Sequence, residues 1–286
     1  MSNDRILTTH TGSLPRPDDL IQIMWAYGDG IPVDETAMNL RIKDAVHEII
    51  KKQIDAGISV VNDGEVSKPS YATYIKDRLS GFGGESPESY FFADLADYPK
   101  SNEIVAANPG RRKRSAPACN GPIGVSDEKA AILDMENLKK SATELKADHM
   151  FSSAASPGVI SLFFKNTYYK SHEEYVFAIA EAMRHEYEAI AATGAFVQLD
   201  CPDLAMGRHT EYAKMSDTEF QKLAAMHIEA LNHAVRNIPA EQLRMHLCWG
   251  NYPGPHHCDV AIGEIIDFVW EAKPQTVLFE AANPRH

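Results

Sequence analysis

The chain has 286 residues, of which 44% are hydrophobic and 24% are charged, a composition typical of a folded protein with a sizeable core. Its formal net charge of −12 argues against non-specific binding to nucleic acid. The lack of any apolar run of membrane-span length argues against a membrane protein. The four cysteines are scattered along the sequence rather than arranged as a disulfide framework, which indicates a reduced, cytoplasmic protein.

The first part of the chain predicts two strands joined by a long helix. Residues 6–10 are predicted to form a strand that runs into a turn at Thr11, Gly12 and Ser13, whose backbone amides suit an anion. An ordinary strand-to-loop turn explains these residues equally well. Apolar residues then recur at helical spacing over 34–56, and a strand is predicted at 58–65. That strand ends in acids, including Glu65, which suit either a solvated loop or a site for a cationic group.

The middle of the chain predicts a departure from this pattern. A helix is predicted at 71–79, and the following stretch to about residue 115 is rich in Gly, Ser and Pro. It is long for a structureless loop, so we expect an inserted excursion around 81–125 that covers one end of the domain and includes an accessory strand at 116–125. The basic run at 111–114 is interpreted as a solvated surface turn rather than a polyanion site.

The rest of the chain alternates strands and helices. Helices are predicted at 127–146, from the capping box at 171–174 to Gly194, and from the capping box at 216–219 onward. Further strands are predicted at 150–156, 196–200, 244–248 and 276–280. Polar residues recur at the C-terminal ends of the strands, where an α/β barrel keeps its active site: Ser13, Glu65, Ser156, Asp200, Cys248 and Glu280.

Repeated strand–helix units predict an α/β fold with a parallel sheet. A doubly wound open sheet also binds ligands at strand ends, but the Gly-x-Gly-x-x-Gly turn of its dinucleotide-binding members is missing. We therefore predict a (β/α)8 TIM-type barrel, a single domain over 1–286 that is truncated after about six strands. Its exposed edge strands favour association with another chain, including a second copy of this one as a homo-oligomer.

Three residues near the end of the sequence form the strongest candidate site. His246 and Cys248 alternate onto one face of a predicted strand, and Glu280 ends the next parallel strand. Nitrogen, sulfur and oxygen donors of this kind suit zinc, and three protein ligands with an open position mark a catalytic site. Ordinary strand residues are the competing interpretation, although a carboxylate at a buried strand end rarely lacks a partner.

Several segments resemble, in order, the catalytic domain of cobalamin-independent methionine synthase. The resemblance spans nearly the whole chain and implies zinc bound by the His-x-Cys pair and the later glutamate. It also implies that Ser13, Glu65 and Asp200, with the turn at Thr11 and Gly12, hold the amino-acid part of homocysteine. The resembling segments are residues 8–15 (TTHTGSLP), 62–65 (NDGE), 198–202 (QLDCP), 246–248 (HLC) and 279–280 (FE).

The sequence departs from that family in several places. The family's further zinc cysteine and its histidine acid lie on strands that would follow residue 286. Cys201 stands where the family has an acid, and 162–165 lacks the tryptophan of the folate site. Cys258 and the pair His256–His257 follow a predicted turn that leaves the strand, so we do not expect them to complete the zinc site. The resemblance supports zinc–thiolate chemistry more firmly than methyltetrahydrofolate as the donor.

These observations predict a zinc-dependent S-methyltransferase whose partners are a small-molecule thiol and an alkyl donor. A zinc-bound thiolate, of homocysteine or a similar thiol, would take a methyl group from methyltetrahydrofolate or a related donor, giving methionine. The acids Glu65 and Asp200 would hold the ammonium group of the thiol, unless they pair with Lys68 or Arg208. The alternatives are an epoxyalkane:coenzyme M-type thiol alkyltransferase of the same superfamily, a uroporphyrinogen-type decarboxylase, and a catalytically inactive zinc-binding barrel.

Overall fold

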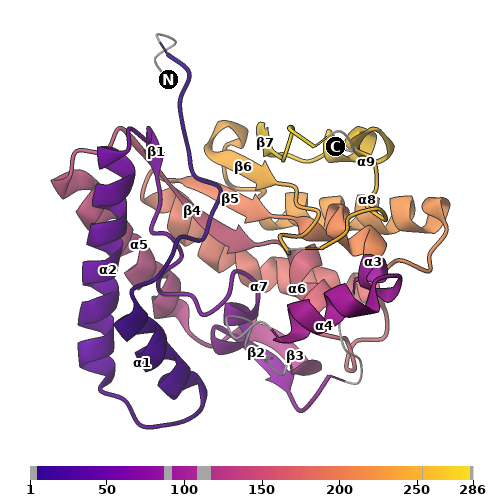
Figure 1. Cartoon of the computed structure of the whole chain (residues 1–286), viewed down its shortest axis with the longest axis horizontal. Coiled ribbons are helices and arrows are strands. Elements are labelled where there is room, and N and C mark those ends of the chain that lie inside the picture. Colours follow the sequence, from indigo (N-terminus) through magenta and orange to yellow (C-terminus); the bar gives the residue numbers. More distant parts are fainter. Residues whose placement is uncertain (1–4, 87–91, 108–116, 253, 284–285) are drawn as a thin grey trace.

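The computed structural model describes residues 5–86, 92–107, 117–252, 254–283 and 286. At its centre is a parallel sheet in the order β1-β4-β5-β6-β7 (Figure 1). Thr9 extends this order by one parallel bridge to Val60 at the outer side of β1. Six segments of the chain therefore lie side by side in chain order. The strands are β1 (Val60–Val61), β4 (His149–Ala155), β5 (Phe196–Asp200), β6 (Leu243–His246) and β7 (Thr276–Leu278).

The helices that precede these strands lie in the same order as the strands themselves. Helix α2 packs on α5, α5 on α7, α7 on α8, and α8 on α9. Strands and helices that advance together in one direction make a barrel wall, whereas a doubly wound sheet reverses its order at one point. The sheet is thus a curled half-barrel, as predicted. The helices are α2 (Glu35–Asp55), α5 (Glu128–Glu144), α7 (His172–Ala192), α8 (Asp217–Ala234) and α9 (Ile262–Val269).

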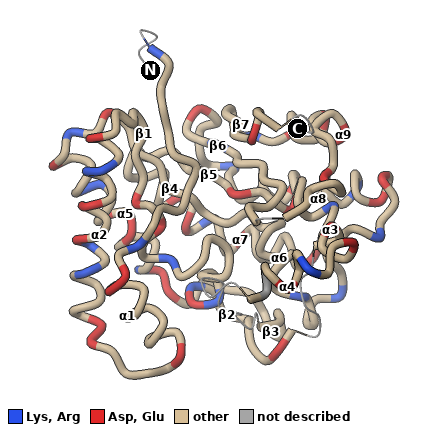
Figure 2. The backbone as a smooth tube through the Cα atoms, in the orientation of Figure 1, with Lys and Arg blue, Asp and Glu red and all other residues tan. Residues whose placement is uncertain are grey.

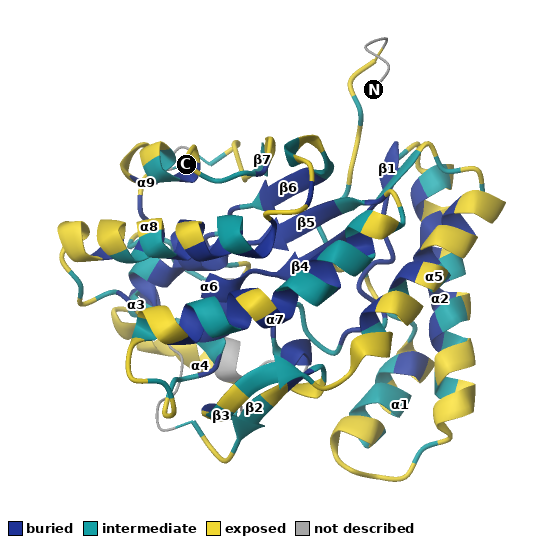
Figure 3. Ribbon diagram, turned by 180° about the vertical axis from the view of Figure 1, so that it is seen from behind, coloured by how far each residue is buried: buried dark blue, intermediate teal, exposed yellow. Residues whose placement is uncertain are grey.

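The core lies between this sheet and its helices. Most of β4, β5 and β6 is buried, while the outward sides of α2 and α7 are exposed (Figure 3). Burial on both faces is expected for a parallel sheet covered by helices. Figure 2 shows basic and acidic residues interspersed along α2, where Lys51 pairs with Asp55 at 2.6 Å. In the described part of the chain, no helix is both long and apolar enough to span a bilayer.

Local sequence signals explain where the helices begin and end. Asp34 caps α2 by accepting a hydrogen bond from the amide of Ala37, and Ser216 and Glu219 form the predicted capping box of α8. Gly57 and Gly194, which follow α2 and α7, have φ of +79° and +85°, a conformation that glycine adopts without strain.

Other predicted boundaries are corrected by the structure. The predicted strand at 6–10 contributes only the bridge at Thr9, because its residues lie exposed at the open edge of the sheet. The predicted helix at 71–79 is a single 3-10 turn, η1 (Thr73–Asp77), after which strand β2 begins at Leu79. The strands predicted to reach Cys248 and Glu280 end two residues earlier, at His246 and Leu278.

A second, smaller sheet lies apart from the half-barrel. Strands β2 (Leu79–Gly83) and β3 (Ala118–Val125) pair antiparallel, and α3 (Ala93–Ala96) and α4 (Pro99–Ala107) lie between them in sequence (Figure 1). The basic run at 111–114 falls outside the described residues. Two helices complete the fold: α1 (Asp18–Gly28) before α2, and α6 (Pro157–Phe163), which directly follows β4 and is buried over most of its length.

Candidate active site

The turn after the first predicted strand lies directly against Glu65. The hydroxyl of Ser13 donates a hydrogen bond to the Glu65 carboxylate. A Cβ atom added to Gly12 would lie 3.0 Å from Glu65 Oε1, so the close approach depends on glycine. The amide of Leu14 donates to the carbonyl of Gly64 at 3.0 Å, which ties the two loops together. The turn and the acid therefore form one structural unit.

Glu65 is held in an uncommon backbone conformation. Its φ of +54° is in the left-handed region, and its amide donates to Asp63 Oδ1 at 2.9 Å. A non-glycine residue in this region costs about 1–3 kcal/mol and persists only where its surroundings enforce it. The side chain is 1% exposed. Burial raises the pKa of Glu65, the nearby Asp200 raises it further, and Lys68 acts in the opposite direction.

Asp200 ends β5 and connects the Glu65 unit to β6. It lies opposite His246 in the parallel register, and its Oδ1 is 3.2 Å from His246 Nδ1. The side-chain amide of Gln198 donates to the same oxygen at 3.3 Å and also to the carbonyl of Thr11. The five predicted substrate-binding positions thus lie around one mouth of the half-barrel, at the C-terminal ends of its strands.

The basic residues that could have neutralised these acids have other partners. Lys68 donates to the carbonyl of Ser153 and lies 3.9 Å from Glu186 Oε1. Arg208 pairs with Asp217 at 2.9 Å. Lys68 still acts on Glu65 through space, since it lowers the pKa of that carboxyl. The ion pairs of both basic side chains thus go to carboxylates outside the predicted site.

The predicted zinc ligands occupy the neighbouring strand ends. Cys248 follows β6, where the amide of Leu247 still pairs with the carbonyl of Leu278, and its sulfur accepts a hydrogen bond from the amide of Gly250 at 3.3 Å. Burial raises the pKa of the Cys248 thiol, and the negative charges of Asp200, Glu280 and Asp259 raise it further. A cation at this point would counteract those charges and favour the thiolate.

The side chain of His246 is oriented to bind a metal, whereas that of Glu280 points largely into solvent. Because Asp200 faces Nδ1 of His246, Nε2 is the nitrogen available to a ligand, an arrangement common among zinc-bound histidines. The Glu280 side chain is 70% exposed, with an oxygen 3.8 Å from His286 Nδ1. Within the described residues, the ligand atoms of His246, Cys248 and Glu280 do not come within 4.8 Å of one another as a set. Glu280 would have to turn inward to complete the site.

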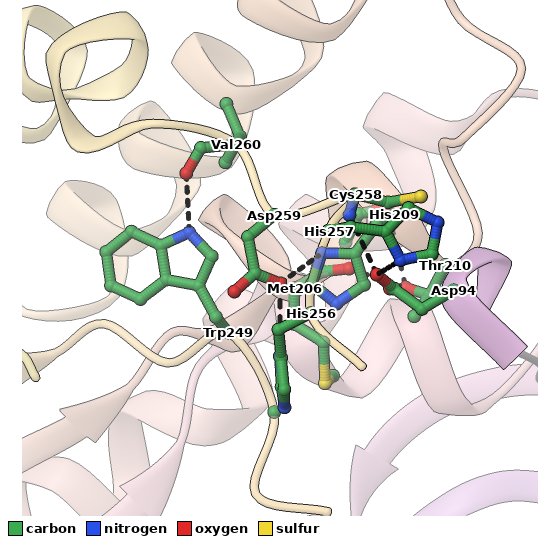
Figure 4. A network of polar contacts seen from close by, with 12 residues as sticks. Asp94, Met206, His209, Thr210, Trp249, His256, His257, Cys258, Asp259 and Val260 are labelled. Atoms are coloured by element: carbon green, nitrogen blue, oxygen red, sulfur yellow. Dashed lines mark hydrogen bonds and ion pairs between the residues drawn. The ribbon is translucent and has the colours of Figure 1, made fainter. Parts of the chain in front are cut away.

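A second group of potential ligands was not predicted as a site. Ligand atoms of Asp94, His209 and Asp259 lie within 4.8 Å of one another, and those of Asp94, His257 and Cys258 form an overlapping group (Figure 4). The run 256–259 (HHCD) carries the sequence signal for this group, but the sequence alone predicts only a turn there.

No family model matches the chain. It is 24% identical over 261 residues to methionine synthase from Saccharolobus solfataricus, covering 90% of this chain and 68% of that protein. It is 28% identical over 246 residues to methionine synthase from Saccharolobus islandicus, covering 86% of this chain and 63% of that one. The chain thus spans about two thirds of the length of these relatives.

Solved structures agree with the fold. A B12-independent methionine synthase from Shewanella sp. W3-18-1, in complex with selenomethionine, superposes with a TM-score of 0.61 at 18% identity, covering 95% of this chain and 72% of that one. A putative B12-independent methionine synthase from Listeria monocytogenes gives 0.59 at 18% identity, covering 87% and 68%. The chain is therefore similar in sequence to methionine synthases, and it shares its fold with B12-independent methionine synthase structures.

Proposed function

We propose that the chain is a zinc-dependent S-methyltransferase that converts homocysteine, or a similar amino-acid thiol, to its methyl thioether. The observation that carries the proposal is the buried pair Glu65 and Asp200 beside His246. Burial and the nearby charge of Asp200 raise the pKa of Glu65, so a cation beside Glu65 is favoured, and an amino-acid thiol supplies an ammonium group. Methyltetrahydrofolate or a related methyl donor would complete the reaction.

Zinc would be held by His246, Cys248 and Glu280. The donor set fits zinc in its chemistry, and the Asp200 contact to His246 Nδ1 gives the imidazole the orientation that a metal ligand needs. When bound, zinc would stabilise the substrate thiol as its thiolate, the form that attacks a methyl carbon. Around that centre, burial of Cys248 and Asp200 limits competition from water.

The turn at residues 11–13 would orient the rest of the thiol substrate. The amide of Gly12 already donates to His10 Nδ1 at 3.1 Å, and that of Leu14 to Gly64. The proposal therefore assigns the substrate carboxylate to the amides of Thr11 and Ser13. The Ser13 hydroxyl, which donates to Glu65, would keep the Glu65 carboxylate turned toward the ammonium group of the substrate. We place this activity in the reducing cytoplasm, where thiol substrates and the four free cysteines stay reduced.

The test compares two thiols that differ in charge. Homocysteine carries an ammonium group, whereas coenzyme M is a sulfonate without one. Calorimetry on the zinc-loaded chain should show homocysteine binding more tightly, and Glu65→Gln should weaken it by 1.5–3 kcal/mol, about 10- to 150-fold, the worth of a hydrogen bond to a charged group. Glu136→Gln on α5, outside the site, is the matched control and should leave binding unchanged.

Two outcomes would overturn this assignment. Tighter binding of coenzyme M would favour the epoxyalkane:coenzyme M type of thiol alkylation. Homocysteine binding that survives Glu65→Gln would remove the acid pair from substrate recognition. A zinc-loaded chain that binds homocysteine but transfers no methyl group to it would instead be an inactive zinc-binding barrel.

A further inference from the structure

Three elements far apart in sequence bring potential metal ligands together beneath the barrel mouth. Asp94 comes from α3, His209 from the 3-10 turn η3 (Met206–His209) after β5, and Asp259 from the loop after β6. Their ligand atoms lie within 4.8 Å of one another, and their side chains converge in Figure 4. Two carboxylates and one imidazole are a donor set that suits a divalent first-row metal ion.

The ligand atoms in this cluster are buried and incompletely paired. His209 is 1% exposed, and neither ring nitrogen meets hydrogen-bond geometry with a described residue, although Nδ1 lies 3.4 Å from Asp259 Oδ1 and the Trp249 backbone is near. Asp94 is 0% exposed, and its Oδ2 also has no partner among the described residues. The nearby Tyr252 hydroxyl donates to the Pro255 carbonyl and also interacts with the Asp94 carboxylate. Buried polar atoms without partners are unfavourable, so a ligand that satisfies them is favoured.

The charge of the cluster also favours a cation. The side chains of Asp94 and Asp259 are both 0% exposed, and buried carboxylates persist when they are paired or bind a metal. His286 Nε2 also lies 3.2 Å from Asp259 Oδ2. A divalent cation in contact with both carboxylates would balance their charge directly.

The surroundings offer further donors and a way in. His256 Nδ1 lies 3.2 Å from Asp259 Oδ1, and His257 Nδ1 lies 3.2 Å from Asp94 Oδ1. A cavity of about 260 Å³ is lined by His209, Cys258 and Asp259, among other residues, and is large enough to admit a hydrated ion. Two of the three ligands, His209 and Asp259, therefore border this cavity.

We propose that Asp94, His209 and Asp259 form a second metal site, for a divalent first-row transition ion such as zinc, separate from His246, Cys248 and Glu280. This site would fasten α3 to the loops that follow β5 and β6. The proposal does not depend on methyl transfer, because it rests on ligand atoms that the proposed reaction does not use.

The experiment counts metal in the full chain after chelator treatment and reloading with cobalt(II), using the Cys248→Ser background. That substitution removes a ligand of the first site, so it isolates the second. We expect one equivalent of cobalt(II) to bind per chain. Its spectrum should show visible cobalt absorption bands but no thiolate-to-cobalt charge-transfer band. Adding His209→Asn or Asp94→Asn should weaken binding about 100-fold or more, because loss of an outer-shell partner alone costs about 10- to 100-fold.

Matched controls separate lost ligands from lost folding. His233→Asn removes another imidazole that contacts a carboxylate, Glu181 at 2.9 Å, and should retain the metal. Circular dichroism verifies the fold of each variant. Cys248→Ser chain that is folded yet binds no cobalt would overturn the proposal, whatever the other variants do. A thiolate band in that background would overturn the ligand set in favour of Asp94, His257 and Cys258.

Discussion

Two buried clusters in this protein contain the same residue types, Asp and His, but differ in how completely their polar atoms are hydrogen-bonded. In the first, Asp203 accepts hydrogen bonds on both oxygens, from the Ser156 hydroxyl at 2.9 Å and from His227 Nδ1 at 2.9 Å. The other nitrogen of His227 lies 2.9 Å from His172 Nε2, which continues the chain of hydrogen bonds. In the second, around His209, the two ring nitrogens of His209 and Oδ2 of Asp94 have no such partners within the described ranges.

The completeness of hydrogen bonding distinguishes a structural network from a binding site. A fully paired network stabilises its own conformation and leaves nothing to attract a ligand. An incompletely paired one has a lasting affinity for whatever completes it. Residue identity and burial do not distinguish the two, because Asp203 and Asp94 are both buried. The hydrogen-bond inventory does. Of three perturbations that test it, two act on the cluster around Asp203 and one compares the two clusters directly.

The largest effect is expected at Gly158, against which the paired network is built. A Cβ atom there would lie 1.9 Å from Asp203 Oδ2 and 2.6 Å from His227 Nδ1. Gly158→Ala should therefore lower the free energy of unfolding by about 3 kcal/mol, at the upper end of overpacking costs. Urea denaturation measures it. Gly263→Ala in α9, where an added Cβ meets nothing within 4 Å, should be neutral or stabilising by up to about 1 kcal/mol. Equal effects at both glycines would contradict the structure around Asp203.

A smaller effect is expected from neutralising one aspartate in each cluster. Asp203→Asn replaces an acceptor of the His227 proton with an amide, and should lower the free energy of unfolding of metal-free protein by about 1–3 kcal/mol. Asp94→Asn keeps an oxygen for the amide of Cys258 and removes a buried negative charge, one of whose oxygens, Oδ2, has no hydrogen-bond partner among the described residues. It should leave the stability of metal-free protein unchanged or raised. If Asp94→Asn destabilises the metal-free chain as much as Asp203→Asn, the two clusters do not differ as described.

The smallest effect is a pH dependence of the paired network. Burial, helped by His227 and Lys165, lowers the pKa of His172 from 6.5 to about 4, while Asp203 acts in the opposite direction. The unfolded chain therefore binds a proton between about pH 6.5 and 4 that the folded chain does not, and stability falls as the pH falls through that window. The full shift would correspond to about 3 kcal/mol, and because solvent screens the partly exposed His172 side chain we expect a loss of about 1–2 kcal/mol. His172→Gln should remove this part of the pH dependence in unfolding experiments from pH 7 to 4, and an unchanged slope would contradict it.

The helices and the general fold were predictable because their signals are local. Apolar spacing and caps such as Asp34 and Ser216 lie within a few residues of what they determine, and the order of strands follows the order of the chain. Strand ends were less predictable, because pairing partners rather than propensity decide where a strand stops. The bridge at Thr9 and the early end of β7 are both at open edges of the sheet.

The candidate sites also differ in how far the sequence predicts them. Glu65 and Asp200 follow strands, so a parallel sheet brings them to one edge, and their proximity was predictable. Glu280 also follows a strand, yet the sequence could not indicate that its side chain is mostly exposed. Asp94 belongs to neither category. It lies between β2 and β3, and no periodicity in the sequence relates it to His209 or Asp259.

The hydrogen bond from the amide of Cys258 to Asp94, 2.7 Å long, connects residues 164 positions apart. Its consequence concerns the order of folding. Strands β4, β5 and β6 lie between these residues in sequence and position the loop that carries Cys258, so we expect this contact to form after the half-barrel has assembled. Interactions that form after the transition state slow unfolding and leave the rate of folding largely unchanged. A metal bound at Asp94 would therefore lengthen the lifetime of the folded state without hastening its formation.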